Sequence, residues 1–240
     1  SIAFMEAHCL KLMILAEARA GFSLIRYREY TFIFSGDVGV VLAPELSQCW
    51  ENFYPKSERV CKIDLRVRGG VMSVIGVYFP YELRIGSAAD IQNNAVLRVE
   101  TNLDLNELLD DADRHPGPTL VLGDFNTSVR EREPEEADVI GPFLYTNGIH
   151  PDPGFLSVRN RDLLLQVCKS HKLRIANTYF ERPQHRKVTF FAKGQTPTHM
   201  LYGLDHPLQP LDYVSYREID HVLVSSKYAR NLLNTYPKQT

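Results

Sequence analysis

Four residues that follow an apolar run carry the sharpest chemical signal in the sequence. Residues 119–122 have the composition of a strand buried on both faces, and Gly123, Asp124, Phe125 and Asn126 come directly after them. Side chains two apart on an extended chain point the same way, so Asp124 and Asn126 are expected to project together. A carboxylate and a carboxamide in this arrangement can bind a divalent ion and hydrogen-bond a phosphate. An Asx turn that caps the strand is the structural alternative.

Three other side chains suit the same chemistry, although each has an ordinary structural explanation. Glu6 follows the apolar run 2–5, where a glutamate is also typical of the first turn of a helix. Tyr78 lies near the end of an apolar run, and strand tyrosines commonly pack with the hydroxyl at the rim of a core. Asp220 is flanked by apolar residues and would be costly to bury without a partner. That cost favours a functional role for Asp220.

The elements that must position these residues are mostly strands. The first expected unit is a strand at residues 2–5 followed by a helix that begins near Leu12 and ends at Gly21. Further strands are expected at residues 30–34, 38–43, 60–68, 71–79, 119–122, 174–178 and 219–225, and helices at residues 90–113 and 162–171. This order predicts one α+β domain over residues 1–240, with two mixed sheets packed face to face and helices outside.

The composition sets limits on the class of protein. The 240 residues are 44% hydrophobic and carry 27 basic and 29 acidic side chains, so the whole-chain charge does not indicate a polyanionic partner. The four cysteines have no spacing that would hold zinc and are expected to be reduced, mostly buried thiols, which suits an intracellular setting. The apolar stretch 8–22 is interrupted by charged residues and is too short to span a bilayer.

Five segments together resemble the endonuclease/exonuclease/phosphatase family. They are GDFN at 123–126, FMEAH at 4–8, VIGVYFP at 74–80, KVTF at 187–190 and IDHVLVS at 219–225. The span 140–180, which contains Asn177 before Thr178, looks specifically like LINE-type retrotransposon endonuclease domains. The likeness covers essentially the whole chain. It implies a four-layer α/β/β/α sandwich.

The resemblance also implies a role for each matched residue. Asp124, Asn126, Tyr78 and Asp220 would be catalytic, with Asp220 orienting a later histidine, while His221 would replace a family tyrosine. Glu6 and Asp124 would be the ligands of Mg²⁺, or alternatively Mn²⁺. The substrate-binding residues would be Asn177, Thr189 and Phe190, although packing in the core is the favoured explanation for Phe190.

The chain departs from the family pattern at both ends. The strand ending in Asn that starts the family and the Ser-Asp-His motif that ends it have no match, so both terminal strands are expected to be missing and the chain to be a poor catalyst. The resemblance implies a Mg²⁺-dependent endonuclease acting on DNA, or alternatively RNA, in a monomeric domain of a retrotransposon polyprotein in the nucleus or cytoplasm, without a membrane. Two alternatives stay open: a non-catalytic remnant of the fold, and a phosphatase on a small substrate such as a phosphoinositide.

Overall fold

A computed structural model describes residues 2–83, 85–145, 159–193 and 216–232. The chain divides into two compact units, Ser1–Phe125 and Asn126–Thr240, and each unit is described by itself. All four cysteines are free thiols, as expected, and Cys61 and Cys168 are buried while Cys9 is exposed. Within the described ranges, no helix is both long enough and apolar enough to cross a lipid bilayer.

The first unit contains two sheets. One is antiparallel, with the order β1 (Leu12–Leu15), β4 (Val38–Leu42), β3 (Tyr30–Ser35) and β2 (Phe22–Tyr27). In the other, β5 (Trp50–Pro55), β6 (Val60–Val67), β7 (Gly70–Tyr78) and β8 (Thr119–Asp124) are successive neighbours. The pair of β7 and β8 is parallel, and the other pairs are antiparallel.

The two sheets of the first unit pack face to face through alternating strand positions. Val38, Val40 and Leu42 of β4 meet Cys61 and Ile63 of β6 in one apolar cluster, and these side chains are fully buried. Burying apolar side chains from both inner faces stabilises a sandwich of this kind. The other face of each strand is therefore available to helices.

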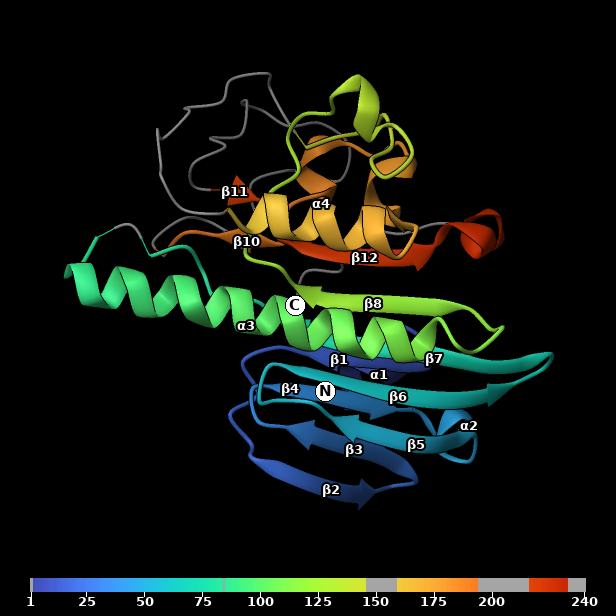
Figure 1. The fold of residues 1–240 in the computed structure, drawn as a ribbon. Helices are drawn as coiled ribbons and strands as arrows, with labels where there is room; N and C mark the ends of the chain where they lie inside the picture. Colours follow the sequence, from blue (N-terminus) through green and yellow to red (C-terminus); the bar gives the residue numbers. More distant parts are fainter. Residues whose placement is uncertain (1, 84, 146–158, 194–215, 233–240) are drawn as a thin grey trace. The chain divides into compact units, whose positions relative to one another are not determined.

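Helices cover both outer faces of this sandwich. The long helix α3 (Ala88–Ala112) begins with a capping box between Ser87 and Asp90. It packs on β6 and β7 (Figure 1). Lys62 on the outer face of β6 donates a hydrogen bond to Asp111 of the helix. On the opposite side, α1 (Ile2–Ala7) buries Met5 in a cluster that contains Val41. A short helix α2 (Pro44–Ser47) follows β4. The first unit thus has the predicted four layers: helix, sheet, sheet, helix.

The predicted order of the first two elements was wrong. Residues 2–7 form a helix rather than a strand, and residues 12–15 form strand β1 rather than a helix. The reason is that β1 is packed on both faces: Leu12 and Ile14 lie against the inner core, while Met13 and Leu15 lie against the cluster around Met5. A strand packed on both faces has no polar alternation, so its apolar residues fit a helical spacing equally well.

Most other predicted elements are confirmed within one to three residues at each end. The structure adds β2 and β5, which were not predicted. The predicted strand 174–178 is shorter, because β9 (Leu173–Ile175) gives way to the 3-10 helix η2 (Ala176–Tyr179).

Among the described residues, the second unit has fewer residues in helices and strands than the first. Helix α4 (Asn160–Ser170) packs on β9, which pairs antiparallel with β12 (Asp220–Ser225). The two-residue strands β10 (Phe190–Phe191) and β11 (Tyr216–Arg217) pair with each other in antiparallel orientation. The remaining 3-10 helices are η1 (Pro134–Glu136), η3 (Gln184–Arg186) and η4 (Ser226–Asn231).

Candidate active site

Tyr78 and Asp124 occupy the last paired position of two parallel strands. The register of β7 and β8 places Tyr78 opposite Asp124, and the backbone N–H of Phe79 donates to the Asp124 carbonyl at 2.8 Å. Both residues therefore lie at the carboxyl ends of their strands, on the same edge of the sheet. Two polar side chains from different parts of the sequence meet there, as the sequence predicted for each strand end.

Gly123 makes this arrangement sterically feasible. A Cβ atom at Gly123 would lie 1.8 Å from the carbonyl oxygen of Val77 on the neighbouring strand. The backbone of β7 approaches Gly123 closely, so Gly123 serves the pairing that aligns Tyr78 with Asp124.

Glu17 is a third member of this group and was missed in the sequence. The Tyr78 hydroxyl donates a hydrogen bond of 2.7 Å to the Oε1 atom of Glu17. Glu17 follows strand β1 with a left-handed backbone (φ 54°), a conformation uncommon outside glycine and often found at functional sites. The backbone beside it is fixed by the N–H of Ala18, which donates to the Asp37 carbonyl at 2.8 Å.

The pKa of Tyr78 depends on its burial and on the charges of its neighbours. Burial of the hydroxyl is the largest cause that raises the pKa of Tyr78, and the hydrogen bond and charge of Glu17 and the charge of Asp124 add to it. The guanidinium of Arg59 acts in the opposite direction from 5.0 Å above the ring. The phenol is therefore neutral at physiological pH, hydrogen-bonded to the Glu17 carboxylate and influenced by the charge of Asp124.

Glu6 is not part of this group. It lies exposed on α1, and its side chain makes none of the hydrogen bonds or ion pairs found among the described residues. Its proposed role as a metal ligand rested on a strand that ends at Met5, and no such strand forms. The sequence signal for Glu17 is the apolar run at residues 12–15, which ends two positions before it.

In the second unit, Asn177 and Thr189 hold the backbone on either side of Asp220. The Thr189 hydroxyl accepts from the backbone N–H groups of Ile219 and Asp220, at 2.9 and 3.1 Å. The Asn177 amide donates to the Asp220 carbonyl at 3.1 Å and accepts from the Val222 N–H at 2.8 Å. Both side chains therefore position Asp220, and these contacts occupy the groups that were predicted to bind substrate.

Asp220 belongs to a cluster of buried ionisable groups. Burial raises the pKa of Asp220 to about 6, against the opposing effect of the Thr189 hydrogen bond. Glu218, only 2% exposed, has its pKa raised to about 7 by burial, although the Asn177 hydrogen bond and the Lys187 charge oppose this. Carboxyl groups with pKa values in this range can exchange protons near neutral pH. Glu218 was also missed; its signal was a second acidic residue in a mainly apolar run.

The remaining predicted residues have structural contacts. Asn126 adopts a left-handed backbone (φ 47°), so the extended chain assumed for residues 124–126 ends at Asp124 and the two side chains do not follow strand alternation. His221 is fully buried, and burial lowers its pKa to about 4. The neutral His221 donates a hydrogen bond from Nε2 to the Thr127 carbonyl at 2.8 Å. The Arg217 guanidinium lies over the Phe190 ring, 4.6 Å from its centre.

The donor set of the first unit fits a hard divalent cation. Among the described residues no three His, Cys, Asp or Glu side chains gather into a metal site. Mg²⁺, however, is commonly held by one or two carboxylates, with water and substrate oxygens completing its shell. Glu17 and Asp124, both close enough to Tyr78 to raise its pKa, supply such a pair.

Comparison with known proteins gives structural relatives only. No protein-family model and no curated protein matches the sequence. An AP endonuclease from Leishmania major matches with a TM-score of 0.62 at 15% identity, over 98% of this chain and 76% of that one. The endonuclease domain of TRAS1, a telomere-specific non-LTR retrotransposon, matches with 0.53 at 8% identity, over 95% and 79%.

A third solved structure carries nucleic acid. It is the 3′ phosphatase NExo from Neisseria bound to a product DNA hairpin, with a TM-score of 0.50 and 16% identity over 94% of this chain and 71% of that one. All three proteins have the endonuclease/exonuclease/phosphatase fold. The chain has this fold too, which confirms the fold expected from the sequence motifs.

Proposed function

We propose that the chain is a metal-dependent phosphodiesterase that hydrolyses nucleic-acid strands. The observation that carries the proposal is the contact of Tyr78 with Glu17 at the strand edge that also bears Asp124. A cation-binding carboxylate pair beside a neutral phenol suits phosphoester hydrolysis, in which negative charge has to be neutralised. The DNA-bound solved relative supports nucleic acid as the substrate class.

In this proposal Glu17 takes the place first assigned to Glu6. Glu17 and Asp124 would hold Mg²⁺, which polarises a phosphate when bound. When Glu17 binds the metal, the single proton of the Tyr78 hydroxyl would turn from the Glu17 carboxylate to a phosphate oxygen. In the second unit, Asp220 would be a positioning residue for a proton-transferring group, because its raised pKa lets it hold or release a proton near neutral pH.

Metal binding tests the carboxylate pair without relying on catalysis. Mn²⁺ titrated into the chain and followed by electron paramagnetic resonance should bind to the wild type. Glu17→Gln and Asp124→Asn should each weaken that binding by about tenfold or more, because one ligand of the pair is lost. Glu6→Gln is the matched control and should bind like the wild type. Weaker binding in Glu6→Gln with normal binding in Glu17→Gln would return the role to Glu6.

Cleavage tests the activity itself. The chain with its natural flanking sequence should nick supercoiled plasmid in Mg²⁺ and stop in a chelator. Glu17→Gln and Asp124→Asn should lower the rate by about 100-fold or more, since each removes charge stabilisation of the transition state. Unchanged nicking in Asp124→Asn would contradict the proposal, and hydrolysis of a phosphoinositide in preference to DNA would favour a small-molecule phosphatase.

A retrotransposon polyprotein is the setting we propose for this activity. The span 140–180 and the structural likeness to the TRAS1 endonuclease domain support it. A reverse transcriptase reading frame next to the coding sequence is the expected genomic finding. Flanking genes without one would argue against this setting and leave the phosphodiesterase proposal unaffected.

A further inference from the structure

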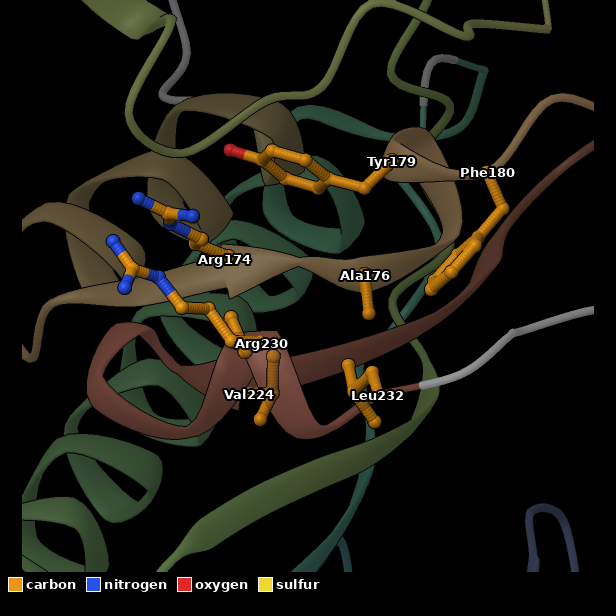
Figure 2. A pocket seen from close by; sticks show the side chains of 8 residues that line it. Arg174, Ala176, Tyr179, Phe180, Val224, Arg230 and Leu232 are labelled. Carbon is orange, nitrogen blue, oxygen red and sulfur yellow. The ribbon is translucent and has the colours of Figure 1, made fainter.

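The second unit contains a pocket that the proposed chemistry does not use. It has a volume of about 150 Å³ and lies among β9, η2, the end of β12 and η4 (Figure 2). Val224 of β12 lines it, four residues after Asp220, and four residues of strand extend over about 13 Å. The pocket is therefore at the opposite end of β12 from the Asp220 cluster.

Two arginines line one end of this pocket. Figure 2 shows the guanidinium groups of Arg174 and Arg230 extending to the same side of it. Within the described residues neither arginine makes an ion pair, and the Nε atom of Arg174 is buried without a hydrogen-bond acceptor. A buried donor without an acceptor is energetically costly, so the Arg174 guanidinium keeps hydrogen-bonding capacity that the described residues do not fill.

The surrounding charges leave this end of the pocket positive. Tyr179 lies beside Arg174, whose guanidinium is 5.5 Å from the ring centre. Burial is the largest cause that raises the pKa of Tyr179; among its charged neighbours, Arg174 and Arg132 lower this pKa, and Asp138 and Cys168 raise it. Asp138 is exposed and forms no ion pair in the described part of the chain. Its backbone carbonyl accepts from the Tyr179 hydroxyl at 3.2 Å, so the ring has a fixed position.

The other end of the pocket is apolar. Ala176, Val224 and Leu232 line it, and the Phe180 ring lies on the far side from the guanidinium groups (Figure 2). A cavity of this volume holds a group about the size of benzene, and this pocket is partly open to solvent, so it takes the anion and the atoms next to it while the rest of a ligand lies outside. The ligand chemistry is therefore a compact oxyanion attached to a small ring.

We propose that this pocket binds a phosphate monoester, of the kind carried by a nucleotide or by the end of a nucleic-acid strand. A tetrahedral phosphate has enough acceptor oxygens for two planar guanidinium groups at once, whereas a carboxylate is satisfied by one. The Phe180 ring and the aliphatic floor then contact the sugar or base. The site holds a strand end or a released nucleotide and takes no part in breaking the phosphodiester bond.

Calorimetry in a chelator tests this site with the catalytic metal removed. Thymidine 5′-monophosphate should bind to the chain, and thymidine without the phosphate should bind at least about tenfold more weakly. Arg174→Gln and Arg230→Gln should each weaken nucleotide binding by about tenfold. Arg68→Gln, at an exposed position in the first unit, is the charge-matched control and should leave binding unchanged.

Each outcome decides the proposal. Equal binding of the nucleotide by Arg230→Gln and by the wild type would overturn it, and Arg230 is exposed, so this variant is expected to fold even if Arg174→Gln does not. Asp124→Asn should retain full nucleotide affinity, which separates failure here from failure of the proposed phosphodiesterase. Eight-residue oligothymidylates with and without a 5′-phosphate then distinguish a strand end from a free nucleotide as the source.

Discussion

The two units place carboxylates in opposite environments. In the first unit, Glu17 and Asp124 lie beside a neutral phenol at a strand edge, where a cation can be held. In the second, Glu218 and Asp220 are withdrawn from water and their pKa values rise to about 7 and about 6. Burial therefore sets the protonation state of these acidic side chains, and in the proposed function it separates the metal ligands from the proton carriers.

The largest expected effect comes from disturbing the backbone below the first group. Gly123→Ala should lower the free energy of unfolding by about 3 kcal/mol or more, because the new methyl group would meet the Val77 carbonyl. Urea unfolding measures it. Gly69→Ala is the control: its Cβ has open space and only a strained backbone (φ 102°), so it should cost about 1 kcal/mol. Equal losses would mean that β7 and β8 are not closely paired at Gly123.

In the second unit, Asn177 should have the next largest effect. Asn177→Ala removes the contacts with Glu218, Asp220 and Val222 and should cost about 2 to 3 kcal/mol in urea unfolding, since buried groups lose their partners. Asn93→Ala at an exposed position of α3 should cost well under 1 kcal/mol, because alanine favours the helix. A small loss in Asn177→Ala would show that Asp220 is positioned by other groups.

The pH dependence of stability tests the buried carboxyl directly. Because the pKa of Glu218 is raised in the folded protein, its contribution to stability is present below the unfolded value near 4.5 and is lost as the pH rises through about 7. Glu218→Gln, which cannot ionise, should gain about 2 kcal/mol relative to the wild type between pH 5 and pH 8. If the free energies of unfolding of the wild type and of Glu218→Gln changed with pH in the same way, Glu218 would not titrate in this range and could not act as a proton carrier there.

Tyr78 should give the smallest effect. Tyr78→Phe keeps the ring and removes the hydroxyl that contacts Glu17, so nicking in Mg²⁺ should slow by about tenfold while Mn²⁺ binding changes little. Rates and metal affinity measured on the same preparation separate the two. Loss of Mn²⁺ binding in this variant would make the phenol a support for the metal ligands rather than a substrate contact.

The sequence predicted best the elements whose patterns are local. The hairpin of β3 and β4, the strands β6 to β8 and the helix α3 follow from turn residues, apolar runs and helical spacing. The first two elements were exchanged because β1 is buried on both faces by partners distant in the sequence. Packing with those partners, rather than local propensity, decided that segment.

The candidate site was predictable to the same degree. Asp124 and Tyr78 end strands that are readable in the sequence, and the parallel register of β7 and β8 pairs them. The contact of Glu17 with Tyr78 could not be predicted, because it depends on the pairing of β1 with β4 and on a left-handed backbone at Glu17. Glu218 was missed since its raised pKa comes from burial, which only the folded chain reveals.

Strand β2 determines how the protein can be handled in solution. It lies at the edge of its sheet, with Phe22, Leu24, Ile25 and Tyr27 all about half exposed or more. An exposed apolar edge is a template for intermolecular strand pairing, and the charge of Arg26 is the main gatekeeper within it. Concentrated samples should therefore be kept at low ionic strength, since salt screens the repulsion between the charged side chains of neighbouring molecules.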